Sequence, residues 1–216
     1  MHTDKAYCKP RRFYDIANVI DAVDCIHVRI KCPAVDEHLY VDRTNYPSLN
    51  VMGVCDSNLK FFNIVAKWPC NTHDSFALRN SKLCVMFEDG DISDGRLLGE
   101  NGYTLQPWLH TPVLNQKARQ KHRYNSSNMR TRCDVERSFG SFKSRFRCID
   151  TTTGTLLYSP VRSCDIAIAV VVLYNICIDN RIPFPPGNDY PRDHGNIEGH
   201  QYFGNQLQNR GAVMPT

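Results

Sequence analysis

The segment Val19-Ile-Asp-Ala-Val-Asp-Cys-Ile-His27 is the most informative part of this chain, because it places a carboxylate within an apolar run. Residues 18–30 carry apolar side chains in mixed alternation, which predicts a largely buried strand. A carboxylate without a partner is costly in such a strand. For Asp24, near the middle of the run, a metal partner is therefore the best explanation.

Two further strands follow this run. Residues 48–56 and 61–68 alternate between apolar and polar side chains, and the segment Asp56-Ser-Asn58 between them supplies turn residues. This pattern predicts a hairpin, with the first strand beside it.

Helical and strand signals then alternate. Apolar positions predict a helix over 76–87, for which Asp74 or Ser75 is a natural N-cap. A short strand is expected at 97–99, and the residues around Trp108 read as a connecting loop. Three strands followed by a helix predict an α/β layered architecture.

Two more helices are predicted in the second half of the chain, over 128–147 and 163–178. The first has apolar residues spaced at i, i+4, i+7 and i+11, which form one stripe on a helix. These residues are Val135, Phe139, Phe142 and Phe146.

Four acidic residues stand beside these apolar segments. Mg²⁺ prefers hard oxygen ligands, and a pair of such ions activates water and stabilises the leaving oxygen of a phosphodiester. The set therefore predicts a metal-dependent nuclease. An N-cap role for the second acid, a surface turn for the third and a solvated helix position for the fourth are the alternatives. The four are Asp24, Asp74, Glu100 and Glu136.

Positive charge is concentrated near the last of these acids. The whole chain carries +4, whereas residues 117–147 hold ten Lys or Arg and two acids, so that this segment carries +8 and the remainder −4. Such a cluster is typical of a surface that holds a phosphate backbone; a solvated helix face is the alternative. The predicted DNA contacts are Arg130, Arg132, Arg137, Lys143 and Arg145.

The ten cysteines do not indicate a metal or disulfide framework. They include no Cys-x-x-Cys pair, and several lie in apolar runs, where Cys behaves as a small hydrophobic residue. Reduced thiols in the nucleus or cytosol are expected. No apolar run reaches the roughly 20 residues of a membrane span, so no membrane partner is expected. The 216 residues suffice for one domain with a substantial core.

Several motifs together resemble the PIF/Harbinger transposase-derived nucleases of the DDE superfamily, over about 13–178. The resemblance implies an RNase H-like fold, a mixed sheet flanked by helices, in which the acids from the first strand, the fourth strand and the last helix converge. The motifs are Asp24-Cys-Ile-His27, Ser48-Leu-Asn-Val51, Val65-Ala-Lys-Trp-Pro69, Thr72-His-Asp-Ser75, Leu97-Leu-Gly-Glu-Asn-Gly-Tyr103 and Val135-Glu-Arg-Ser-Phe-Gly-Ser-Phe-Lys-Ser-Arg-Phe-Arg147.

The resemblance also assigns roles to particular residues. It implies that Asp24, Glu100 and Glu136 are catalytic and bind Mg²⁺ or Mn²⁺, with Asp74 as a further metal ligand. His27 and His73 match family positions near the site, where a support role and a purely structural role are both open. The family usually has Asp at the position of Glu100, and Ser at the next position.

The resemblance finally sets expectations for the whole chain. Residues 1–17 are interpreted as a remnant without the family's helix-turn-helix region, 18–178 as the nuclease domain and 179–216 as a flexible tail. The expected function is metal-dependent DNA cleavage in the nucleus, with a Myb-like partner protein supplying sequence choice. The alternative is a weakened or inactive domesticated remnant that binds DNA or protein.

Overall fold

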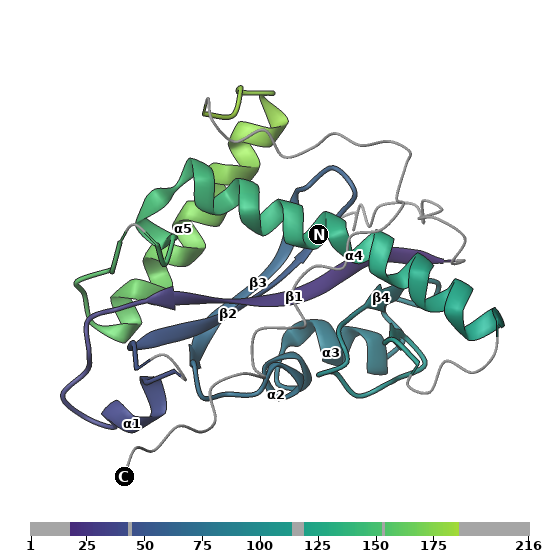
Figure 1. The fold of residues 1–216 in the computed structure, drawn as a ribbon, viewed down its shortest axis with the longest axis horizontal. Coiled ribbons are helices and arrows are strands. Elements are labelled where there is room, and N and C mark those ends of the chain that lie inside the picture. Colours follow the sequence, from purple (N-terminus) through teal and green to yellow (C-terminus); the bar gives the residue numbers. More distant parts are fainter. Residues whose placement is uncertain (1–17, 43–44, 114–118, 153, 186–216) are drawn as a thin grey trace, which may run out of the picture.

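Strand β1 lies at the centre of a mixed five-stranded sheet in a computed structural model that describes residues 18–42, 45–113, 119–152 and 154–185 (Figure 1). The strand order is β3-β2-β1-β4-β5, with β1, β2 and β3 antiparallel and β4 and β5 parallel to β1. The strands are β1 (Val19–Arg29), β2 (Ser48–Cys55), β3 (Phe61–Pro69), β4 (Arg96–Leu98) and β5 (Leu109–His110).

Helices cover both faces of this sheet (Figure 1). The long helices α4 and α5 contribute to one hydrophobic cluster, whereas α2 and α3 contribute to a second cluster built on the opposite side chains of the same strands. The expected α/β architecture is thus confirmed. The helices are α1 (Glu37–Tyr40), α2 (Asp74–Arg79), α3 (Lys82–Glu88), α4 (Arg119–Arg145) and α5 (Pro160–Asp179), with a 3-10 turn, η1, at Arg147–Ile149.

Strand β1 is buried on both faces, which explains its mixed apolar pattern. Ala22 and Ile26 belong to the cluster under α4 and α5, whereas Val23 and Cys25 belong to the cluster under α2 and α3. Because successive side chains of a strand point to opposite faces, Asp24 shares its face with Ala22 and Ile26. The predicted acid therefore faces helix α4.

Gly53 allows helix α4 to approach the sheet closely. It lies opposite Asp24 in the β1–β2 register, and a Cβ atom there would stand 2.7 Å from Cζ of Phe139 and 3.0 Å from a ring carbon of Phe61. A larger residue would have to displace these rings. The glycine thus helps to set the distance between the sheet and the helix that carries Glu136.

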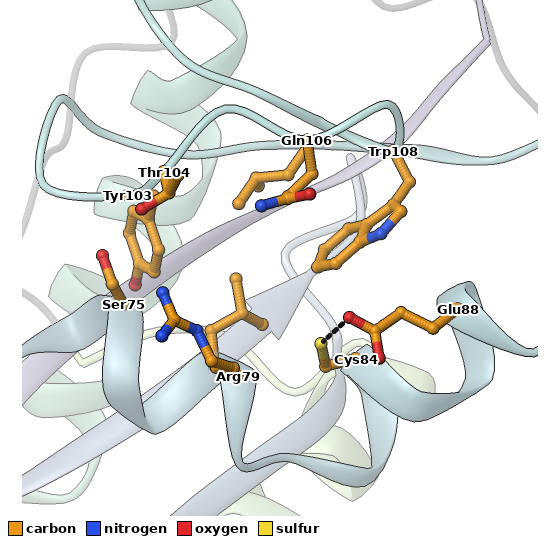
Figure 2. A pocket seen from close by; sticks show the side chains of 10 residues that line it. Ser75, Arg79, Cys84, Glu88, Tyr103, Thr104, Gln106 and Trp108 are labelled. Atoms are coloured by element: carbon orange, nitrogen blue, oxygen red, sulfur yellow. Dashed lines mark hydrogen bonds between the residues drawn. The ribbon is translucent and has the colours of Figure 1, made fainter.

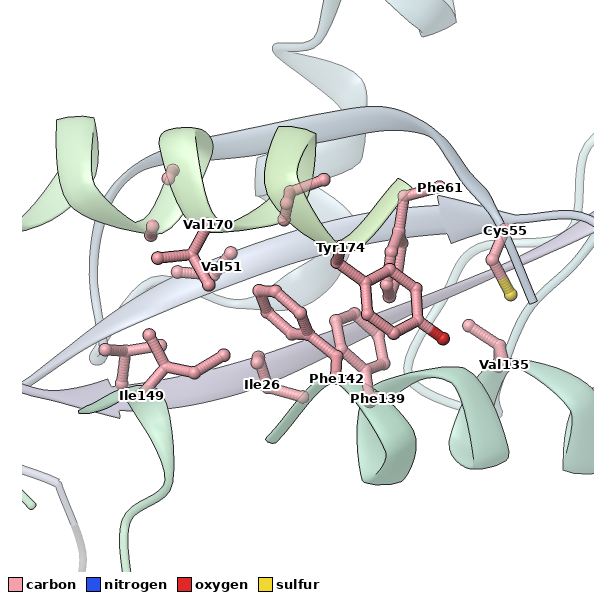
Figure 3. Close-up of a cluster of buried hydrophobic side chains, with 14 of the residues drawn as sticks. Ile26, Val51, Cys55, Phe61, Val135, Phe139, Phe142, Ile149, Val170 and Tyr174 are labelled. Carbon is pink, nitrogen blue, oxygen red and sulfur yellow. The ribbon is translucent and has the colours of Figure 1, made fainter. Parts of the chain in front are cut away.

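Aromatic rings fill the space between the sheet, α4 and α5 (Figure 3). The ring of Phe61 lies 5.0 Å from that of Phe139, 5.6 Å from Phe142 and 5.6 Å from Tyr174, measured between centroids. Burying a side chain such as Phe contributes about 1.5–3 kcal/mol. Three residues of the predicted stripe, Val135, Phe139 and Phe142, are buried on α4, whereas Phe146 lies one residue after the helix ends and is half-buried.

The helix predicted over 76–87 is wrong in detail, because two short helices replace it. The side chain of Asn80 donates to the carbonyl of Phe76 and ends α2. Ser81 then caps α3, and its Oγ accepts from the backbone N–H of Cys84 at 3.2 Å. The N-cap of α2 is His73, not Asp74 or Ser75.

The other differences concern the ends of elements. Helix α4 starts at Arg119, earlier than expected, and the expected loop around Trp108 contains strand β5. Helix α5 starts at Pro160, capped by Ser159, and extends into the segment expected to be a tail. Residues 1–17 and 186–216, interpreted as remnant and tail, lie outside the described residues.

Two other expectations bear on class. The nine cysteines in the described part of the chain are all free. Among the described residues, one helix, α5, has the length and composition of a membrane span. Its inward side chains, among them Val170 and Tyr174, pack into the core on the α4 side of the sheet.

Candidate active site

Asp24 is a half-buried carboxylate on the sheet face that α4 covers. It lies near the middle of β1, and its Oδ1 accepts the backbone N–H of Cys25 at 2.8 Å. Burial raises the pKa of Asp24 to about 7, the Cys25 hydrogen bond and Arg132 oppose the rise, and the charges of Glu100 and Glu136 add to it. The carboxylates of β1, the β4 end and α4 therefore act on one another.

Glu100 and Glu136 meet through Arg132. Glu100 follows β4, while Arg132 and Glu136 lie one turn apart on α4. The Arg132 guanidinium donates to Oε1 of Glu100 and, at 3.2 Å, to Oε1 of Glu136. The Arg132 side chain is 11% exposed, against 50% for Glu100 and 55% for Glu136. The guanidinium is therefore the enclosed member of this trio.

The three carboxylates suit a divalent cation by their chemistry. Carboxylate oxygens are the ligands that Mg²⁺ and Mn²⁺ prefer, and a cationic group already lies against two of them. In the part of the chain that the structure describes, no three His, Cys, Asp or Glu side chains are grouped closely enough to hold a metal ion together. The three carboxylates are therefore ligands of the type that a divalent cation prefers. In this structure, the positive charge beside two of them is the guanidinium of Arg132.

Asp74 lies on the other face of the sheet. It starts helix α2, and its Oδ1 accepts from the amide of Asn50 at 2.8 Å. Burial raises the pKa of the Cys25 thiol and of the Tyr103 hydroxyl, and the charge of Asp74 raises both further. The Tyr103 hydroxyl lies 3.5 Å from the Cys25 sulfur. The metal role of Asp74 stays a prediction, since these contacts do not join it to Glu100 or Glu136.

The two histidines have structural partners. His73 caps helix α2, because its Nδ1 accepts from the backbone N–H of Ser75 at 3.2 Å. Nδ1 of His27 stands 3.9 Å from a carboxylate oxygen of Asp42, at a side chain that is 43% exposed. His27 lies on the face of β1 opposite Asp24 and Ile26, because successive side chains of a strand point to opposite faces, and it therefore faces away from α4.

The predicted DNA contacts occupy different surroundings. Arg130 is exposed, and Arg137 and Lys143 are half-buried. Burial lowers the pKa of Lys143, while Asp150 and Asp24 oppose the shift, which places its ammonium group within the field of the site. The five predicted contacts therefore do not form one uniform surface.

Arg145 is bound to the chain itself. Its guanidinium donates to the carbonyls of Ile182 at 2.7 Å and Pro183 at 3.0 Å, and lies 4.6 Å from the ring centre of Phe184. No sequence pattern indicated this contact, because the partner residues belong to the segment expected to be a tail.

Sequence reasoning missed Asp21, three residues before Asp24 on the same strand. Its side chain is buried, and its Oδ1 has no hydrogen-bond partner among the described residues. Burial, with a smaller contribution from Asp56, raises the pKa of Asp21 to about 9. Its place in the same apolar run was a usable signal, but no family motif pointed to it.

A small hollow lies beside α2 and α3 (Figure 2). Its volume is about 80 Å³, and its lining includes Arg79, Glu88, Tyr103, Gln106 and Trp108. Small-molecule sites usually measure roughly 300–1,000 Å³. The hollow is therefore too small to compete with the carboxylate cluster as the principal site.

Comparison with known proteins agrees with these features. Residues 23–175 match the family described as "DDE superfamily endonuclease". The chain is 37% identical over 171 residues to the Homo sapiens protein named "Putative nuclease HARBI1", which covers 78% of this chain and 49% of that protein. The Mus musculus protein of the same name is 36% identical over 187 residues, covering 83% and 54%.

A more distant relative is "Protein ALP1-like" of Arabidopsis thaliana, 23% identical over 82% of this chain and 47% of that protein. The chain spans about half the length of the curated relatives that it matches. No solved structure matches it. The matched region contains Asp24, Glu100 and Glu136, and the chain therefore belongs to the DDE superfamily endonucleases, among the Harbinger-derived proteins that its motifs indicated.

Proposed function

We propose that this chain is a divalent-metal-dependent endonuclease that cleaves DNA, with Asp24, Glu100 and Glu136 as the residues that hold the cation. The observation that supports this most is that Glu100, after β4, and Glu136, on α4, meet at one guanidinium on the sheet face that carries Asp24. A bound divalent cation lowers the pKa of an attacking water and stabilises the leaving oxygen of a phosphodiester.

The protein groups would divide the remaining work. Asp24 is fixed by the Cys25 backbone and gives the site a rigid ligand on the sheet. Glu100 and Glu136 are half exposed, so that their carboxylates face both the site and solvent. Lys143 adds a half-buried positive charge that acts on Asp24, and such a charge favours a phosphate next to the carboxylates.

Helix α4 would supply the DNA surface. Its exposed N-terminal half carries Arg119, Lys121, Arg123 and Arg130. Contacts from Lys and Arg to phosphates give affinity without sequence choice. A sequence-specific DNA-binding partner, Myb-like by the family resemblance, and a nuclear location remain part of this proposal.

The test is nicking of supercoiled plasmid with Mn²⁺ or Mg²⁺. Asp24→Asn should abolish nicking, because the amide removes a ligand charge without changing its shape. Asp21→Asn is the matched control on the same strand and should keep full nicking. Equal nicking by the unchanged chain and Asp24→Asn would contradict the proposed site.

A DNA-binding protein without cleavage is the second candidate. Two observations favour it: Arg132 already neutralises Glu100 and Glu136, and a Glu stands where the family usually has Asp. In that case the chain would bind DNA but neither nick it nor gain thermal stability from Mn²⁺. Glu100→Asp separates the two cases further, since restored nicking would show a site that has drifted from cleavage.

A further inference from the structure

Arg132 is the positive charge that is built into the carboxylate cluster. Its guanidinium contacts Glu100 and Glu136, and its charge also acts on Asp24. It therefore interacts with all three residues proposed to hold the cation.

We propose that Arg132 is an internal counter-charge which a divalent cation must displace, so that the chain switches between an arginine-closed and a cation-loaded site. This inference rests on the proposed function, because it concerns the same three carboxylates. It adds a competition within the chain that sets the apparent cation affinity and that the family assignment does not supply.

The competition follows from charge and space. A guanidinium and a divalent cation compete for these carboxylate oxygens, because both are positive and both use the oxygens as direct partners. Without Arg132, three carboxylates would repel one another in a partly buried place. With it, the cluster is partly neutralised, and cation binding must first break the contacts to Glu100 and Glu136.

Two features of the structure allow the Arg132 side chain to leave the carboxylates. The Nε of Arg132 is buried without a hydrogen-bond partner among the described residues, and such a donor destabilises the arrangement that encloses it. Glu100 and Glu136 are both half exposed, so that rotation about the Arg132 side-chain bonds can bring the guanidinium to solvent. The helix backbone need not move.

Displacement would also link cation to DNA. Once released, the guanidinium lies on the basic helix α4, where it can meet a phosphate oxygen in a bidentate contact. A cation that frees Arg132 then strengthens DNA binding, and by reciprocity DNA strengthens cation binding by the same factor.

The experiment is a calorimetric titration of Mn²⁺ into the full chain and three variants, without DNA. Arg132→Gln removes the competing charge and should bind Mn²⁺ about ten-fold more tightly than the unchanged chain. Arg132→Lys keeps a charge but lacks the planar fork, and should fall between the two; it also serves if Arg132→Gln does not fold.

Arg130→Gln is the control, because it removes the same charge from an exposed position on the same helix. Its gain in Mn²⁺ affinity measures the general electrostatic effect, and Arg132→Gln must exceed it. Thermal melting gives a second readout: without Mn²⁺, Arg132→Gln should melt below the unchanged chain, and Mn²⁺ should raise its melting temperature more.

The outcomes separate this inference from the proposed function. If the unchanged chain binds Mn²⁺ and Arg132→Gln binds it equally or more weakly, the competition is wrong while the metal site stands. If neither the unchanged chain nor either Arg132 variant binds Mn²⁺, the proposed metal site fails and the inference fails with it. Binding by Arg132→Gln alone would support a strongly closed site.

Discussion

Helices α4 and α5 cover the same face of the sheet, but they bring different side chains to it. Helix α5 buries Ala167, Val170, Val171 and Tyr174, with Ser163 as its one buried polar residue among those described. Helix α4 buries Val135, Phe139 and Phe142 in the same way, but places four polar residues in buried positions beside them. These are Asn128, Arg132, Ser138 and Ser141.

The difference shows that two helices on the same face of the sheet can contribute in different ways. Helix α5 has no charged residue from 166 to 178, and it stabilises the layer by apolar contact. Helix α4 accepts a buried guanidinium and an adjacent carboxylate, which a purely structural helix would avoid because buried charges destabilise unless paired. The carboxylate cluster therefore lies at the helix that keeps a buried charge despite its destabilising effect.

The largest expected effect compares an acid from each helix. Glu136→Gln on α4 should lower cation-dependent nicking roughly 10³-fold or more, because a proposed ligand loses its charge. Asp165→Asn on α5 removes the same charge from an exposed position and should leave nicking unchanged. Initial nicking rates at fixed Mn²⁺ measure both. Equal losses in the two variants would place the effect in overall charge rather than in the site.

The next effect tests the shared packing duty. Phe142→Ala on α4 and Tyr174→Ala on α5 should each lower the free energy of unfolding by about 3–5 kcal/mol, since both rings are fully buried in one cluster. Urea unfolding measures this. Leu173→Ala, at a side chain that is 50% exposed, is the control and should cost much less. A small loss in Tyr174→Ala alone would mean that α5 contributes little to the core.

The central fold could be predicted from the sequence because its signals are local. The apolar run around Asp24, the hairpin and the stripe of α4 each show their period within a few residues. The break between α2 and α3 escaped prediction, because Ser81 can end one helix or start the next and only the tertiary packing decides. Strand β5 has two residues, too few for any alternation to show.

The site could be predicted only by residue type. The motifs pointed to Asp24, Glu100 and Glu136, whose metal role stays a prediction. Arg132 was expected on the DNA surface, and its contact with both glutamates depends on the distance between β4 and α4. Arg145 shows the same limit, because its partners lie 37 and 38 residues further along the chain. Long side chains choose partners by geometry that spacing does not encode.

A further prediction concerns pH and compares Asp24 with Asp21. The pKa of Asp24 rises from 3.8 to about 7 on folding, so the native state binds the extra proton between these values. Stability should therefore fall as pH increases from about 4 to 7 and then level off for this group. Asp24→Asn should remove that part of the fall. Asp21→Asn should remove a fall that continues to about pH 9.

Urea midpoints across pH 4–9 measure these slopes without any cation present. The two variants should also differ with Mn²⁺, since only Asp24→Asn should lose the rise in melting temperature that the cation gives. A pH slope that stays the same in both variants would show that neither carboxyl is protonated in the native protein.

The smallest expected effect lies where α4 meets the chain after α5. Arg145→Ala removes two hydrogen bonds to the carbonyls of Ile182 and Pro183, and should cost about 1 kcal/mol of stability. It should leave DNA affinity unchanged, because this guanidinium is already engaged. Arg130→Ala should do the opposite: stability stays, while DNA binding weakens and its salt dependence falls by about one counterion.

Fluorescence anisotropy with a labelled duplex at several salt concentrations distinguishes the two arginines. An equal loss of affinity in both variants would mean that DNA draws Arg145 away from residues 182–184. In that case the last turn of α4 would belong to the DNA surface, as its exposed N-terminal half does in the proposed function. Unchanged DNA affinity in Arg145→Ala would mean that the last turn of α4, like α5, serves packing.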